Sequence, residues 1–211
     1  MNVRLVEKIE ENFDLVQKLE LQRIKMQPVP LKAVTTSKYI RETLEERKFG
    51  KVDEVEAGIC RDNELIAVVM RWRDRSKDDV IRDYNSFVDA CAVMFPLREF
   101  ASVMTMGSED APVNIWLWRA DNKVYDVISR GLGTTRRRDA KMSGLRAFGE
   151  YSDGTWTVVF VRPLKSTNRE EFVDLSPKKR TGIAFAVWEG SNRERGPLKA
   201  YSGEFMSLEV L

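Results

Sequence analysis

The sequence contains no histidine and only two cysteines, Cys60 and Cys91, and these scarcities exclude several classes of protein. Without histidine there is no His-based general acid or base, no Ser-His-Asp or Cys-His nucleophile system, and no His-ligated zinc or haem. Two cysteines cannot form a four-cysteine zinc or iron-sulfur site, and no Cys-x-x-Cys-His sequence is present for covalent haem attachment. We therefore interpret Cys60 and Cys91 as small buried hydrophobic residues.

Long apolar runs and an excess of one charge are missing as well. No stretch reaches the length of a membrane-spanning helix, and acidic side chains occur from Glu7 onward, unlike in a signal peptide. The chain as it stands is therefore expected to be cytoplasmic, with a periplasmic location open if a signal was removed or if export depends on a partner. The 35 Lys and Arg balance the 33 Asp and Glu, so the net charge of +2 gives no argument for nucleic-acid binding.

What the chain does contain, from residue 52 onward, is a series of short strand-like runs separated by turn residues. The runs cover 53–60, 64–73, 89–95, 113–118, 153–164, 181–190 and 201–211. Many short strands at hairpin spacing, without alternating helices, predict a mainly β protein built as an antiparallel β-sandwich or barrel.

The first 51 residues have a different pattern. Apolar residues between 3 and 22 recur at spacings of three and four, which predicts an amphipathic helix. A second short helix is predicted for 37–51, with Ser37 as N-cap and Gly50 near the C-cap. We therefore expect a helical N-terminal extension over 1–51, a β-sandwich domain over 52–211, and few other helices.

Two groups of residues attract attention as candidate functional features. Met104 and Met106 lie two residues apart in a loop that precedes the alternating strand 113–118. Arg136, Arg137 and Arg138 form a charge run, which we interpret as a solvated loop rather than a phosphate site. One hypothesis for the aromatic residues is a non-redox module that binds a carbohydrate or another small ligand in a cleft lined by tryptophans, namely Trp72, Trp116, Trp118, Trp156 and Trp188.

Several sequence blocks resemble a known family. They are MRWRDRSKDD, DACAVMFP, MGSEDAPVNIWLWRAD, DGTWTVVFVRPL and IAFAVWEGSNRERGPLKAYS, in that order over residues 66–211. These blocks are similar to the haem b-binding γ subunits of ethylbenzene dehydrogenase, dimethylsulfide dehydrogenase, selenate reductase and chlorate reductase. Those proteins are the electron-transfer subunits of a branch of the dimethyl sulfoxide reductase family of molybdenum enzymes. The first 50 residues match this pattern poorly.

The resemblance implies a β-sandwich that holds one non-covalent haem b between a methionine and a lysine. In this sequence the methionine before a glycine is Met106, with Met104 as the fallback, and the lysine is Lys199. Within the same blocks, Asn114, Trp116 and Trp188 are candidate cofactor-binding residues. The resemblance also implies a non-catalytic role, an iron-sulfur β subunit and a molybdopterin α subunit as partners, and an external electron acceptor or donor.

Ligation by lysine has a physical cost. The amine must lose its proton, which from an ordinary pKa near 10.4 costs roughly 4–5 kcal/mol at pH 7. Burial of Lys199 in an apolar pocket would reduce that cost, because desolvation favours the neutral amine. From charge alone, Arg193, Arg195 or the run Arg136 to Arg138 are candidates to pair with haem propionates. The carbohydrate hypothesis stays open beside this one, and visible absorption would discriminate between them.

Overall fold

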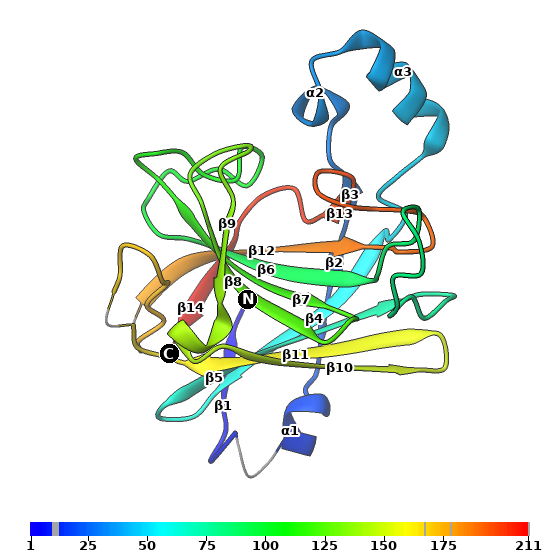
Figure 1. The fold of residues 1–211 in the computed structure, drawn as a ribbon. Helices are drawn as coiled ribbons and strands as arrows, with labels where there is room; N and C mark the ends of the chain where they lie inside the picture. The colour runs from blue at the N-terminus through cyan, green and yellow to red at the C-terminus, as the bar shows by residue number, and fades with distance from the viewer. Residues whose placement is uncertain (10–12, 167, 178, 211) are drawn as a thin grey trace.

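The computed structural model describes residues 1–9, 13–166, 168–177 and 179–210, which form two β-sheets packed face to face (Figure 1). The first sheet contains, in order, β1 (Val3–Leu5), β4 (Glu54–Arg61), β5 (Leu65–Arg73), β11 (Thr155–Pro163) and β10 (Arg146–Ser152), with β2 (Gln22–Lys25) also paired to β4. The second contains β3 (Gln27–Pro28), β13 (Ala200–Tyr201), β12 (Lys179–Trp188), β6 (Ala90–Pro96), β7 (Val113–Arg119), β8 (Lys123–Ser129) and β9 (Arg136–Asp139), with β14 (Met206–Val210) paired to β12. The prediction of an antiparallel sandwich is confirmed, and β1 with β4 is a parallel exception.

The core between the sheets is rich in tryptophan. Trp72, Trp116, Trp118 and Trp156 are each 2% exposed or less, and the ring centroids of Trp118 and Trp156 lie 5.0 Å apart. Because side chains alternate along a strand, the odd-numbered residues of β7 face away from this core. Val113 and Ile115 accordingly belong to a separate apolar cluster on the outer face of the second sheet, as the alternation in the sequence predicted.

The predicted helix over 3–22 is wrong. The segment forms β1, a short α1 (Phe13–Gln17) and β2, while residues 10–12 lie outside the described part of the chain. Its apolar residues are nevertheless buried, because Val6, Ile9 and Leu19 pack on the outer face of the first sheet. The free edge of β4 offers backbone partners that a surface helix would leave unused, so tertiary pairing overrides the helical spacing. Residues before 52 therefore supply strands to both sheets.

The second predicted helix is confirmed. It is α3 (Lys38–Arg47), and the Oγ of Ser37 accepts a hydrogen bond from the backbone N of Ile40 at 3.4 Å. The helix ends at Lys48 in the left-handed region, with φ of 52°, two residues before the expected Gly50. A short α2 (Leu31–Val34) precedes it, and both helices project from the sandwich near β3 and β13 (Figure 1). No helix in the described part of the chain is long and apolar enough to cross a bilayer.

The basic run Arg136 to Arg138 is a strand rather than a loop, and only Arg136 and Arg137 are exposed to solvent. It forms β9, beside the 3₁₀ helix η1 (Ala140–Ser143), and Arg138 is only 7% exposed. The guanidinium of Arg138 pairs with the carboxylates of Asp126 and Glu171. The interpretation is wrong for Arg138 because its acidic partners lie on β8 and on a distant loop.

A pair of buried aspartates joins the loops at one end of the sandwich. The carboxylate of Asp89 accepts hydrogen bonds from Gly190 N at 2.8 Å, Trp156 Nε1 at 2.9 Å and Asp78 N at 2.8 Å. The carboxyl of Asp74 lies beside it, and its Oδ2 has no donor partner among the described residues. A proton shared between the two carboxyls would supply that missing donor.

Burial raises the pKa of both aspartates above the ordinary range. Desolvation is the larger cause for each; the charge of Asp74 adds to it at Asp89, and the charges of Glu189 and Asp78 add to it at Asp74. The folded state therefore binds more protons than the unfolded state at mildly acidic pH. The free energy of unfolding that this pair contributes falls as pH rises through that window.

We predict that Asp74→Asn weakens this pH dependence, because the amide resembles a permanently protonated Asp74 and removes its charge from Asp89, whose pKa burial still raises. The variant should be more stable than the native sequence by roughly 2 kcal/mol at pH 8, with the difference shrinking towards pH 4. Urea unfolding at several pH values measures it. Parallel pH profiles for the two proteins would contradict the shared proton.

Candidate functional site

A cavity of about 810 Å³ lies on the outer face of the second sheet. Its floor is formed by alanines at alternate positions of two neighbouring strands, Ala90 and Ala92 of β6 and Ala184 and Ala186 of β12. Ala92 and Ala186 are directly opposite each other in the register. Because these side chains are small, the floor lies close to the backbone and leaves room for a flat apolar ligand.

The walls come from segments that are distant in sequence. One wall is the loop between β6 and β7, and the others are the segment before β6, the loop between β8 and β9, α2 and the loop between β12 and β13. The loop between β6 and β7 contributes Val103 and Met106, and the loop between β8 and β9 contributes Leu132. Helix α2 contributes Ala33. The sheet therefore provides the base, while loops and α2 enclose it.

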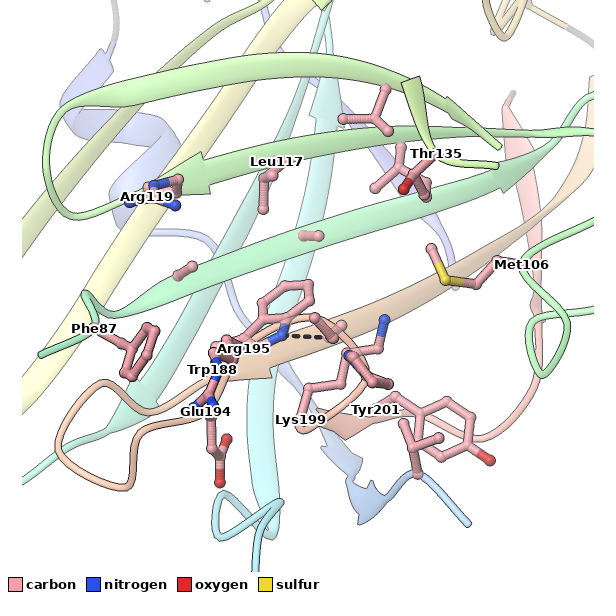
Figure 2. A pocket seen from close by; sticks show the side chains of 18 of the residues that line it. Phe87, Met106, Leu117, Arg119, Thr135, Trp188, Glu194, Arg195, Lys199 and Tyr201 are labelled. Atoms are coloured by element: carbon pink, nitrogen blue, oxygen red, sulfur yellow. Dashed lines mark hydrogen bonds between the residues drawn. The ribbon is translucent and has the colours of Figure 1, made fainter. Parts of the chain in front are cut away.

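Met106 is held in an uncommon backbone conformation, with φ of 56°. Its N donates to Val103 O at 3.1 Å, and its O accepts from Gly131 N at 3.2 Å. A left-handed conformation is unfavourable for a residue with a side chain and persists only where the surroundings determine it. Figure 2 shows its sulfur directed into the cavity. Met104 also lines the cavity but is 37% exposed, and its sulfur lies 4.0 Å from the hydroxyl of Tyr201.

Lys199 is 8% exposed and enters the cavity from the start of β13 (Figure 2). Its Nζ lies 4.9 Å from the ring centroid of Trp188, whose Nε1 donates to Gly196 O at 3.0 Å. Within the described part of the chain, no carboxylate forms an ion pair with Lys199. Burial lowers the pKa of Lys199 to about 8, so its deprotonation at pH 7 costs only about 1.4 kcal/mol.

Asn114 and Trp116 do not belong to this cavity. Both lie on the inner face of β7, and both are fully buried. Asn114 donates from Nδ2 to Asp126 Oδ1 at 2.7 Å and accepts from Val173 N at 3.1 Å, which fixes the connection before β12. Trp116 packs on Phe95 at a centroid distance of 4.6 Å. The structure thus brings together Met106, Lys199 and Trp188, and separates them from the other two candidates.

Two of the candidate arginines line the cavity. Arg137 lies over the ring of Tyr125 at 5.2 Å, and Arg195 lies over that of Phe87 at 4.4 Å. Neither has a carboxylate within ion-pair distance among the described residues. Arg193 does not line the cavity, and Arg136 is paired with Glu171 at 2.9 Å. Only two of the five candidates therefore remain available to an anionic ligand group.

Sequence reasoning missed three parts of the site. The alanine floor had a detectable signal, because alanines alternate with larger residues in both DACAVMF and IAFAVW. Arg119 lines the cavity but is paired with Asp121 at 3.0 Å. Glu194 is 1% exposed beside the cavity, yet it stands between two arginines in a polar loop, and nothing in that pattern indicates burial.

The turn that holds Met106 generates a prediction about Gly107. Gly107 has φ of 83°, and a Cβ there would lie 2.9 Å from the carbonyl O of Ala111. We expect Gly107→Ala to lower the free energy of unfolding by about 2–4 kcal/mol, measured by urea titration. Gly133→Ala is the matched control, because its φ of 81° is similar but no atom lies within 4 Å. An equal loss in both variants would show that the close approach at Gly107 has no energetic consequence.

Comparison of the sequence with known proteins identifies its family. The family model described as ethylbenzene dehydrogenase matches residues 17–148 and 137–200. The chain is 34% identical to the chlorate reductase subunit gamma of Ideonella dechloratans over 142 residues, which is 67% of this chain and 58% of that protein. It is 31% identical to the dimethylsulfide dehydrogenase subunit gamma of Rhodovulum sulfidophilum over 152 residues, or 68% of this chain and 56% of that one.

A Haloferax mediterranei protein named for the heme subunit of a respiratory nitrate reductase is 36% identical over 144 residues, 68% of this chain and 51% of that protein. The chain thus spans little more than half the length of these relatives. Among solved structures, a family 9 carbohydrate-binding module from Caldicellulosiruptor kristjanssonii superposes with a TM-score of 0.54 at 10% identity, covering 99% of this chain and 94% of the module. That likeness concerns the fold alone. The matched family model and the relatives together show that this chain belongs to the ethylbenzene dehydrogenase family.

Proposed function

We propose that this chain is a non-catalytic electron-transfer subunit that binds one non-covalent haem b, with Met106 and Lys199 as the axial ligands. The observation that carries the proposal is the presence of a buried lysine without an ion-pair partner in the described residues, beside a conformationally fixed methionine, in one apolar cavity. A bound haem would supply one-electron exchange between ferrous and ferric iron.

The residues of the cavity fit this cofactor. An apolar floor of alanines suits the face of a porphyrin, and the sequence offers no histidine as a competing ligand. The thioether of Met106 is a soft ligand that favours ferrous iron. Each of these features supports the Met and Lys pair that the family resemblance implies.

Lys199 can ligate iron only as a neutral amine. Burial disfavours its charged form, and a nearby metal charge would disfavour it further. The ring of Trp188 acts in the opposite direction, because a cation over an aromatic face is stabilised. We infer that Trp188 holds the protonated side chain beside the cavity and releases it as the amine becomes neutral.

The two free arginines of the cavity fit the propionate groups. Arginine forms short, charge-assisted hydrogen bonds with carboxylates, often through two N–H groups. Arg137 and Arg195 lie over aromatic rings, and neither forms an ion pair among the described residues. We assign them as the propionate partners of this site.

The names of the relatives support a place in a larger complex. Two of them are gamma subunits of a chlorate reductase and of a dimethylsulfide dehydrogenase. We propose that this chain likewise associates with an iron-sulfur β subunit and a molybdopterin α subunit, and that it passes single electrons to or from an external partner.

The carbohydrate hypothesis loses its main support in the structure. Four of the five tryptophans are buried between the sheets, and only Trp188 lines the cavity. Stacking on a sugar requires exposed aromatic faces, and these are not available for the buried rings. We therefore favour the redox function.

Absorption spectroscopy tests the ligands. Protein reconstituted with haem should show sharp low-spin α and β bands after reduction, and Lys199→Ala and Met106→Ala should each alter them, because each removes one axial ligand. Met104→Ala and Lys141→Ala are matched controls, since Lys141 is exposed outside the cavity. Altered bands in Met104→Ala but not in Met106→Ala would reassign the methionine, and a colourless native protein would reject the proposal.

Titration with haem tests the arginines. Arg137→Gln and Arg195→Gln should each weaken haem affinity by about tenfold, as expected for one lost charge-assisted contact that is partly solvated. Arg136→Gln removes the same charge from the same strand without touching the cavity, and it should leave the affinity unchanged. Equal effects in all three variants would indicate a general effect of charge rather than a propionate site.

A further inference from the structure

The segment from Val29 to Lys51, here called the arm, forms one wall of the cavity and packs on the sheet through a small apolar cluster. It contains α2 and α3, and α2 contributes Ala33 and Val34 to the cavity lining. Among its residues only Val29, Leu44 and Phe49 are buried. Figure 1 shows the two helices projecting from the sandwich. Polar contacts at the base of the arm add to this apolar packing.

Glu194 makes the polar contacts at the base of the arm. Its side chain is 1% exposed, and its Oε1 accepts hydrogen bonds from Gly50 N at 2.7 Å, Lys51 N at 3.2 Å and Asn192 Nδ2 at 2.8 Å. Its Oε2 accepts from Glu189 N at 3.1 Å. One carboxylate thus joins the end of the arm to the loop between β12 and β13.

Arg47 adds a second set of contacts between the same two segments. Its Nη2 donates to the carbonyl O of Asn192 at 2.7 Å and to that of Arg193 at 2.9 Å. In the other direction, Asn192 Nδ2 lies 3.2 Å from the carbonyl O of Lys48. The arm and the loop are therefore linked by hydrogen bonds that run both ways.

The base of the arm lies directly against the backbone of Lys199. A Cβ on Gly50 would approach the carbonyl O of Lys199 to 3.0 Å and the Cα of Pro28 to 2.6 Å. The same carbonyl accepts a hydrogen bond from Val29 N at 3.3 Å. A displacement of residues 48–51 would therefore loosen the backbone that carries the Lys199 side chain.

We propose that Glu194 is a positioning residue, whose buried carboxylate keeps the arm closed over the cavity and fixes the backbone from which the Lys199 side chain enters it. This inference rests on the proposed haem function, and it extends that function to the entry and retention of the cofactor. Arg47 supports Glu194 from the arm side. When these contacts are lost, the arm moves away and the cavity opens on the side formed by α2.

The test uses Glu194→Gln, because all the partners of this carboxylate are N–H donors. An amide places its own NH₂ against at least one of them, so at least one hydrogen bond is lost without a change of size. We expect haem transfer from the reconstituted protein to excess apomyoglobin to become at least tenfold faster, which corresponds to about 1.4 kcal/mol. The bands of the lysine-ligated haem should weaken in the same variant.

Glu189→Gln is the matched control. Glu189 lies in the same loop, and its carboxylate bonds to Ser191 at 2.8 Å but not to the arm. It should retain haem as the native sequence does. The inference would be overturned if Glu194→Gln lost haem at the native rate with an unchanged spectrum. It would also be overturned if Glu189→Gln lost haem as fast as Glu194→Gln.

Arg47→Met provides a second route if Glu194→Gln does not fold. It removes the contacts from the arm side, and it should also accelerate haem loss. Native-like haem retention in Arg47→Met would then count against a closed arm.

A folded native protein that takes up no haem would reject the proposed function instead, and amide exchange at Gly50 and Lys51 would then test the contact itself. Exchange that is unchanged in Glu194→Gln would overturn the role of this residue.

Discussion

The constraint on which the rest of this structure depends is the alternation of side chains across the second sheet. On β7, Trp116 and Trp118 point into the core while Ile115 and Leu117 point out. One face of the sheet can therefore be filled with large aromatic rings while the other remains shallow and apolar. The same alternation on β6 and β12 places alanines under the cavity, so that the sandwich core and the candidate haem site are two faces of one set of strands.

Buried polar side chains hold the segments that strand pairing leaves free. Asp89 fixes the loops at one end of the sandwich, Asn114 fixes the connection before β12, and Glu194 joins the arm to the loop before β13. Each of these side chains satisfies backbone N–H groups that would otherwise be buried without a partner. Because such networks are costly when only partly satisfied, they specify one arrangement of the loops rather than several.

The cavity combines low polarity with an unusual set of charges. Lys199 is buried without an ion-pair partner in the described residues, and the free arginines lie where carboxylates of a ligand could reach them. In a protein without a resident cofactor, a buried and unpaired lysine would only be destabilising. In the proposed haem complex the same features would serve as a ligand and its anchors, which is the physical reason to connect this geometry with the heme subunit for which one relative is named.

The sequence by itself determined the fold class, the strands with strong alternation and the helix α3 with its Ser37 cap, because these depend on local periodicity and capping. It also proposed Met106 and Lys199 as ligands, through blocks that resemble a family rather than through any local rule, and the structure places both side chains at one cavity. Only the tertiary structure decided that β1 and β2 pair with β4, that Arg138 is buried, and that Trp116 faces the core instead of the cavity. Partners such as Glu171 for Arg138, or Gly50 for Glu194, are far apart in the chain, and no pattern of neighbouring residues encodes which distant groups will meet.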